Sequence, residues 1–241
     1  MNERAAVTAI VPAFDREDTV GPTVTALRSL APVGEVIVVD DGSSDATAAM
    51  ASAAGARVIR LGRNRGKAAA VVAGVGATDA DVVLLIDADT GSSATEAGGL
   101  LVPIMRDEAD MSIAVLPSAG GRGGFGVVRD VAAEIIDASV GLRVDAPLSG
   151  QRALRREWWR HLGPVDRFGL EVALTVDLHR AGARIVEVPT NFDHRHTGRG
   201  LDGFRHRGRQ GVDLLRAAAA RIGWRRVLTV VAASATGRLR R

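Results

Sequence analysis

The chain has 241 residues, with 46% hydrophobic and 24% charged side chains, which is enough to bury one sizeable core and excludes disordered, collagen-like and fibrous classes. Because it contains no cysteine, disulfides, thiolate metal sites and a cysteine nucleophile are also excluded. The net charge of +3 comes from residues spread along the chain, so it does not indicate a nucleic-acid partner.

Strands and helices are expected to alternate from the beginning of the chain. Nearly continuous apolar runs predict strands that are buried on both faces, and helical spacing of apolar residues predicts helices between them. The expected strands are 5–11, 35–40, 56–61 and 81–87, with helices at 19–30, 45–54 and 67–77. After residue 90 we expect a helix at 94–106, a strand at 111–116, helices at 127–140, through Trp158 and at 169–181, and a last strand at 183–190. This order predicts an α/β fold with an open, mostly parallel sheet and helices on both faces.

The domain organisation follows from the same pattern. We expect one domain at residues 1–200 and a basic, amphipathic appendage at 201–241, where 210–226 has the pattern of a helix. No secretory signal is visible and no apolar run approaches the roughly 20 residues needed to cross a bilayer, so we expect a cytoplasmic protein. The arginine-rich appendage is either a solvated face or a peripheral contact with anionic lipid at the inner membrane face. The sequence leaves a homo-oligomer open.

Polar clusters follow each of the first four expected strands. They are 12–17, 40–45, 64–67 and 87–89, and the third ends in Lys67, the one lysine among 31 basic residues. Ligands of open parallel sheets bind outside the carboxyl ends of the strands. We therefore expect the four clusters to converge at one edge of the sheet.

Asp87 and Asp89 are separated by one small residue at the end of an apolar strand. In an extended segment their side chains share a side, and such hard oxygen ligands suit Mg²⁺ or Mn²⁺ that bridges phosphate oxygens. The alternative is a turn that merely ends a strand. A G-x-G-x-x-G pattern at 121–126 follows the fifth expected strand and not the first, so it does not indicate a dinucleotide-binding fold.

Four motifs in order carry a family resemblance: VPAFDRED at 11–18, VVDDGSSDAT at 38–47, NRGKAAAV at 64–71 and LIDAD at 85–89. In this order and spacing the chain resembles family 2 glycosyltransferases of the GT-A fold. PLSGQRALRR at 147–156 and FGLEVAL at 168–174 are similar, more narrowly, to dolichol- or polyprenyl-phosphate sugar transferases and to glucosyl-3-phosphoglycerate synthases.

The resemblance implies an activity. The chain would transfer a sugar from a UDP- or GDP-sugar to a phosphate- or hydroxyl-bearing acceptor, with Mn²⁺ or Mg²⁺ as cofactor. A polyprenyl phosphate or a small phosphorylated acid is the implied acceptor. Two other hypotheses stay open: a nucleotidyltransferase on a similar α/β sheet, and a non-catalytic nucleotide-sugar-binding protein.

The resemblance also implies roles for residues at the donor site. Residues lining the nucleoside pocket or contacting the base would be Pro12, Ala13, Glu17 and Asp40 or Asp41, with Lys67 near the nucleotide. Asp87, Ala88 and Asp89 would form the D-x-D motif, with Asp89 favoured as the direct metal ligand. Arg122, in the glycine-rich loop, is available for the diphosphate, and the loop with Ser149 and Gln151 would lie near the donor sugar or the acceptor.

The transfer step is less defined by the resemblance. Glu171 is the candidate base, or it holds the sugar or the acceptor, and Asp166 is a second candidate; inversion and retention both stay open. His194 or His196 would complete the metal shell, or these histidines are structural.

Overall fold

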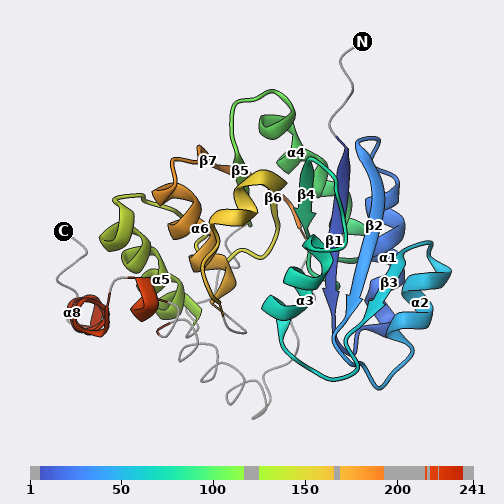
Figure 1. Cartoon of the computed structure of the whole chain (residues 1–241), viewed down its shortest axis with the longest axis horizontal. Coiled ribbons are helices and arrows are strands. Elements are labelled where there is room, and N and C mark those ends of the chain that lie inside the picture. Colours follow the sequence, from blue (N-terminus) through green and yellow to red (C-terminus); the bar gives the residue numbers. More distant parts are fainter. Residues whose placement is uncertain are drawn as a thin grey trace.

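The computed structural model describes residues 6–116, 125–165, 169–192, 215, 218–221 and 223–235. Its centre is a seven-stranded sheet in the order β3-β2-β1-β4-β6-β5-β7, in which β6 runs antiparallel to its two neighbours (Figure 1). The strands are β1 (Val7–Ala13), β2 (Val33–Asp40), β3 (Arg57–Arg60), β4 (Val82–Leu85), β5 (Met111–Val115), β6 (Arg152–Arg155) and β7 (Ile185–Pro189). The α-helices are α1 (Glu17–Arg28), α2 (Thr47–Ala53), α3 (Lys67–Val75), α4 (Ala97–Met105), α5 (Phe125–Val140), α6 (Leu170–Arg180) and α8 (Trp224–Ala235), and 3₁₀ turns occupy η1 (Gly91–Glu96) and η2 (Arg156–His161).

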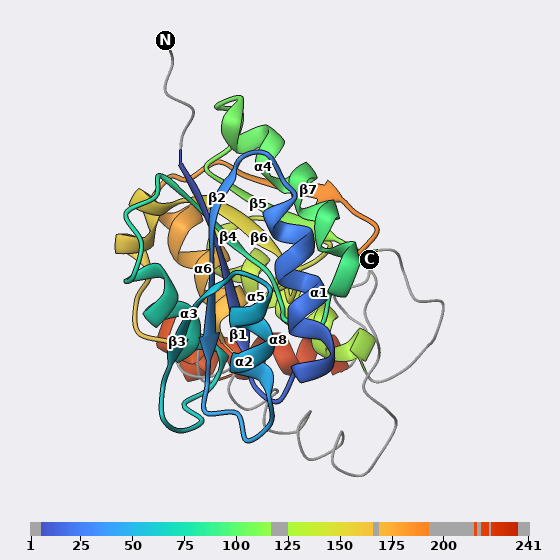
Figure 2. The same cartoon turned by 90° about the vertical axis from the view of Figure 1, so that its right-hand side faces the viewer.

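Successive side chains of the central strands alternate between two buried faces, which explains their continuous apolar character. In β1, Ala9 and Val11 pack in one hydrophobic cluster with α1 and α4, whereas Ile10 packs in another with α3. Helices α1, α2 and α4 therefore cover one face of the sheet, and α3 and α6 cover the other (Figure 2).

A third hydrophobic cluster joins α5, α6 and the described C-terminal residues. Val172 and Val176 of α6 pack in it with Ala218 and with Val227 of α8, on the side of α6 that faces away from the sheet (Figure 1). The Arg221 guanidinium also forms an ion pair with Asp177 of α6. The described part of the segment predicted as an appendage thus packs against the helix that carries Glu171.

The α/β fold with an open, mostly parallel sheet is confirmed, and six of the seven strands lie at the predicted places. The prediction misses β6, and it places an α-helix through Trp158 where the structure has the 3₁₀ turn η2. Four residues containing two arginines do not look like a central strand, because arginine is rarely buried. At the C-terminus, the helix expected at 210–226 does not run through Gly223, which is not helical and has a φ of 80°; α8 begins at Trp224 and extends to Ala235. Within the described residues, no helix is both long and apolar enough to span a membrane.

Candidate functional site

The predicted polar clusters do converge at the carboxyl ends of the parallel strands. β1 lies between β2 and β4, and the chain order of the sheet reverses beside β1, which is where open α/β sheets bind their ligands. The loop after β1 is joined to the loop after β2, since the Asp15 carboxylate accepts hydrogen bonds from the Ser44 amide and hydroxyl. Asp15 has a φ of 50°, a left-handed conformation that the contact with Ser44 helps to hold.

Glu17 takes part in the same junction. Its carboxylate accepts a hydrogen bond from the Ala46 amide at 2.8 Å, and its own amide donates to the Asp45 carboxylate. Asp45 also accepts hydrogen bonds from the amide and hydroxyl of Thr47, the first residue of α2. Pro12 and Ala13 lie directly before this junction, at the end of β1.

The adjacent carboxylates of Asp40 and Asp41 are both buried, and each has its own partner. Asp40 accepts the Ser43 amide and lies 3.8 Å from the Arg60 guanidinium. Asp41 accepts the amides of Arg65 and Gly66 at 2.7 Å with its two oxygens. These contacts compensate the repulsion between neighbouring charges and hold the loop that leads into Lys67. A direct contact of either residue with a base stays a prediction.

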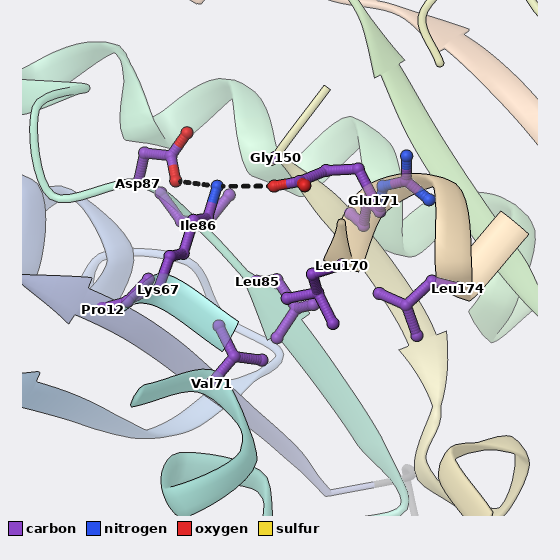
Figure 3. Close-up of a pocket in the computed structure, with 11 residues that line it drawn as sticks. Pro12, Lys67, Val71, Leu85, Ile86, Asp87, Gly150, Leu170, Glu171 and Leu174 are labelled. Carbon is purple, nitrogen blue, oxygen red and sulfur yellow. Dashed lines mark ion pairs between the residues drawn. The ribbon is translucent and has the colours of Figure 1, made fainter. Parts of the chain in front are cut away.

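Lys67 links the D-x-D segment to α6. As the first residue of α3, it places its Nζ 2.6 Å from Asp87 Oδ1 and 3.0 Å from Glu171 Oε1 (Figure 3). Glu171 lies in the first turn of α6, where a negative charge is favoured by the helix dipole. The apolar side chains of Val71, Leu170 and other residues surround this arrangement in the pocket of Figure 3. The sequence predicts Lys67 near the nucleotide but not this bridge between two carboxylates.

The two carboxylates determine the charge of Lys67. Burial by itself lowers the pKa of its ammonium, but the charges of Asp87 and Glu171 outweigh burial and raise that pKa above its ordinary value. Lys67 is therefore positively charged at neutral pH. This positive charge lies between the carboxylates of Asp87 and Glu171.

The D-x-D segment is a turn and not the extended segment that the sequence predicts. β4 ends at Leu85, and the Thr90 amide and hydroxyl both donate to the Asp87 carbonyl. Asp87 also accepts a hydrogen bond from Gln151 Nε2 at 3.0 Å, and Ala88 between the two carboxylates is buried. The strand thus ends in a turn, as the alternative interpretation expects, whereas metal binding by Asp87 and Asp89 stays a prediction.

A divalent cation of the Mg²⁺ type at Asp87 and Asp89 stays a prediction from the sequence. Such ions are commonly held by one or two carboxylates together with phosphate oxygens of the substrate, and not by a complete protein cage. Within the described residues, no group of three or more His, Cys, Asp or Glu side chains is placed to hold a metal ion. Asp89 and Asp87 would hold the ion, and the ion would neutralise charge on the diphosphate.

The loop after α5 closes the site from the other side. The buried Ser149 hydroxyl donates to Gln151 Oε1, which orients the Gln151 amide toward Asp87. A Cβ on Gly150 would approach Asp87 Oδ2 to 2.7 Å and Lys67 Nζ even more closely, so the backbone itself contacts the ion pair. The sequence predicts Ser149 and Gln151 at the site, whereas it assigns no role to Gly150 or to the fully buried Arg152, although both lie in the same PLSGQRALRR motif. The predicted Arg122, Asp166, His194 and His196 lie outside the described residues.

Open α/β sheets whose polar residues meet at the switch point form a class of proteins that bind ligands at that edge. Residues 8–162 match the model of the family described as glycosyl transferase family 2. The chain belongs to this family.

Curated relatives include glucosyl-3-phosphoglycerate synthase of Mycolicibacterium paratuberculosis, which is 28% identical over 71% of this chain and 59% of the relative. An undecaprenyl-phosphate 4-deoxy-4-formamido-L-arabinose transferase of Klebsiella pneumoniae is 25% identical over 80% of this chain and 61% of the relative. The chain thus spans about 60% of the length of these two relatives.

Solved structures of the glucosyl-3-phosphoglycerate synthase from Mycobacterium tuberculosis are also similar. The complex with Mg²⁺ and UDP is 25% identical, with a TM-score of 0.78 over 91% of this chain and 80% of that one. The complex with Mn²⁺, UDP-glucose and phosphoglyceric acid has a TM-score of 0.74 at 25% identity and the same coverage. These comparisons confirm the predicted family and fold, and the similar synthase has been solved in complexes with Mg²⁺ or Mn²⁺.

Proposed function

We propose that this glycosyltransferase transfers a sugar from a UDP-sugar, held with Mn²⁺ or Mg²⁺, to a small phosphorylated acid. The observation that carries the proposal is the bridge of Lys67 between Asp87 and Glu171, because it joins the donor motif to a carboxylate on α6. Of the two synthase structures reported above, one holds Mg²⁺ and UDP, and the other holds Mn²⁺, UDP-glucose and phosphoglyceric acid. These ligands favour UDP over GDP as the first donor to test.

We assign a task in this reaction to each residue of the candidate site. Asp89 and Asp87 hold the cation that offsets the charge of the leaving diphosphate, and Lys67 adds a fixed positive charge beside it. Glu171 orients the acceptor or the sugar from the opposite side of Lys67. Asp166, His194 and His196 remain candidates for the base and for the metal shell, and Arg122 for the diphosphate.

A thermal-shift experiment tests the donor and the metal together. UDP, GDP and their sugars are added with and without Mn²⁺ or Mg²⁺ to the wild type and to Asp89→Ala. Saturation at about 100 times the Kd adds about 2.7 kcal/mol of stability, which raises the Tm of a domain of this size by roughly 5–10 °C. We expect this shift with UDP and metal in the wild type and its loss in Asp89→Ala.

The control is Asp79→Ala, which removes an exposed carboxylate whose nearest ionic partner is Arg156 at 3.9 Å. It should keep the full shift. If no nucleotide stabilises the wild type in the presence of metal, the proposed donor is wrong. Stabilisation by UDP without release of sugar from any UDP-sugar would favour the non-catalytic binding protein instead.

A polyprenyl phosphate is the second candidate acceptor. One observation favours it: Trp224 and Leu228, one helical turn apart on α8, are 53% and 62% exposed, and Arg225 and Arg226 are exposed on the same helix. Exposed aromatic and aliphatic side chains beside arginine are typical of helices that lie on anionic membranes.

Co-sedimentation with vesicles tests this candidate. The wild type should bind vesicles that contain phosphatidylglycerol more strongly than neutral ones, and the double variant Trp224→Ala, Leu228→Ala should lose most of that binding. Replacing Val72 of α3, which is 45% exposed, by Ala is the matched control and should change nothing. Equal sedimentation of wild type and double variant would contradict the membrane contact.

A further inference from the structure

Arg152 is a buried cation whose hydrogen-bond partners are neutral. Its side chain is fully buried at the start of β6, and burial lowers its pKa to about 10, with the charges of Glu171 and Glu187 opposing this shift. Among the described residues its guanidinium donates to the Ser149 carbonyl at 2.8 Å, to the Thr175 hydroxyl at 2.9 Å and to the Pro147 carbonyl at 3.2 Å. Burying a charge in this way is costly, so an apolar side chain would serve the core at lower cost.

The hydrogen bonds of Arg152 converge on the loop that contacts Asp87. Pro147 and Ser149 belong to this loop, and the next residues, Gly150 and Gln151, touch Lys67 and Asp87 directly. A planar guanidinium with several donors fixes two carbonyls in a way that the single ammonium of lysine does not. Arg152 thus sets the position from which Gln151 orients the Asp87 carboxylate.

The hydrogen bond from Arg152 to Thr175 reaches α6. Thr175 accepts it and in turn donates to the carbonyl of Glu171, one helical turn away. Arg152 therefore connects the loop beside Asp87 with the helix that carries Glu171, behind the direct bridge made by Lys67.

We propose that Arg152 is a positioning residue that holds the 147–151 loop and α6 in register, so that Asp87 and Glu171 keep the geometry needed for the donor and its cation. This inference rests on the proposed function. Residues that orient metal-binding carboxylates typically change metal affinity or activity 10–100-fold when they are replaced.

The test uses Arg152→Lys and Thr175→Val. Binding of UDP in saturating Mn²⁺ is measured by calorimetry, and the Tm of each variant is measured separately. We expect Arg152→Lys to weaken UDP binding about tenfold, and Thr175→Val to weaken it in the same direction. A residue with only a structural role would lower the Tm but leave the Kd of the folded protein unchanged.

Two matched control variants alter an arginine and a threonine that make similar contacts away from the site. Arg155→Lys alters an arginine of the same strand that pairs with Asp107, and Thr25→Val removes a threonine hydroxyl bonded to the carbonyl four residues earlier in α1. Both should bind UDP as the wild type does. If Arg152→Lys does not fold, Thr175→Val decides by the same criterion.

Two failures are distinguishable. Wild-type affinity in the folded Arg152→Lys and Thr175→Val variants would overturn the positioning role while leaving the proposed function intact. Absence of Mn²⁺-dependent UDP binding in the wild type would overturn the proposed function and this inference with it.

Discussion

Replacing Lys67 by methionine is expected to lower kcat/KM by about 100-fold, the usual effect of removing one fixed charge or donor from a transfer site. The reason is that Asp87 and Glu171 then face each other without the cation that bridges them at 2.6 and 3.0 Å. The free energy of unfolding should fall by about 2 kcal/mol, because charge-assisted hydrogen bonds of a largely buried group are lost. Steady-state kinetics and urea unfolding measure the two effects.

The loss of stability should depend on pH in a defined direction. Because the folded-state pKa of Lys67 lies above its ordinary value of 10.5, the bridge contributes its full stability below that pH. The contribution is lost as the pH rises through the higher, folded-state pKa. The difference in unfolding free energy between wild type and Lys67→Met should therefore stay constant from neutral pH to about pH 9 and shrink only above about pH 10.5. A difference that is already lost at pH 8 would contradict the bridge.

Replacing Gly150 by alanine is expected to weaken binding of UDP with Mn²⁺ about tenfold or more. The new Cβ would meet Lys67 Nζ and the Asp87 carboxylate, so the ion pair has to move away from the geometry that the donor needs. Because the lysine end is flexible, the free energy of unfolding should fall by only about 1 kcal/mol. Calorimetry with UDP and Mn²⁺, together with urea unfolding, separates the two effects.

Gly99→Ala is the control for this substitution. Gly99 lies within α4, and a Cβ there would have its nearest neighbour, Val188 Cγ1, at an ordinary 3.8 Å. This variant should bind UDP like the wild type. Unchanged affinity in Gly150→Ala would show that the backbone at Gly150 does not constrain the ion pair.

The convergence of the site could be predicted from sequence because it depends on local signals and on one general rule. Continuous apolar runs mark parallel strands, and the polar residues after these strands must meet at the carboxyl edge of the sheet. The contacts of Asp15 with Ser44, of Asp41 with Gly66 and of Lys67 with Asp87 are the result.

The partners of individual side chains could not be predicted in the same way. The sequence does not show that the Glu17 carboxylate accepts the Ala46 amide, or that the D-x-D segment turns at Asp87. Both outcomes depend on which loop lies opposite, and the sequence of one loop carries no information about the geometry of another.

The sequence by itself determined the α/β class, the edge of the sheet at which the polar clusters meet and the identity of the charged residues there, because strand periodicity and motif order are local properties of the chain. The tertiary structure decided which charges pair. Only the insertion of antiparallel β6 between β4 and β5 buries Arg152 and brings Gln151 and Gly150 against Asp87 and Lys67. Pairing across long sequence separations depends on the packed geometry of the whole sheet, and a four-residue segment with two arginines gives no local signal of it.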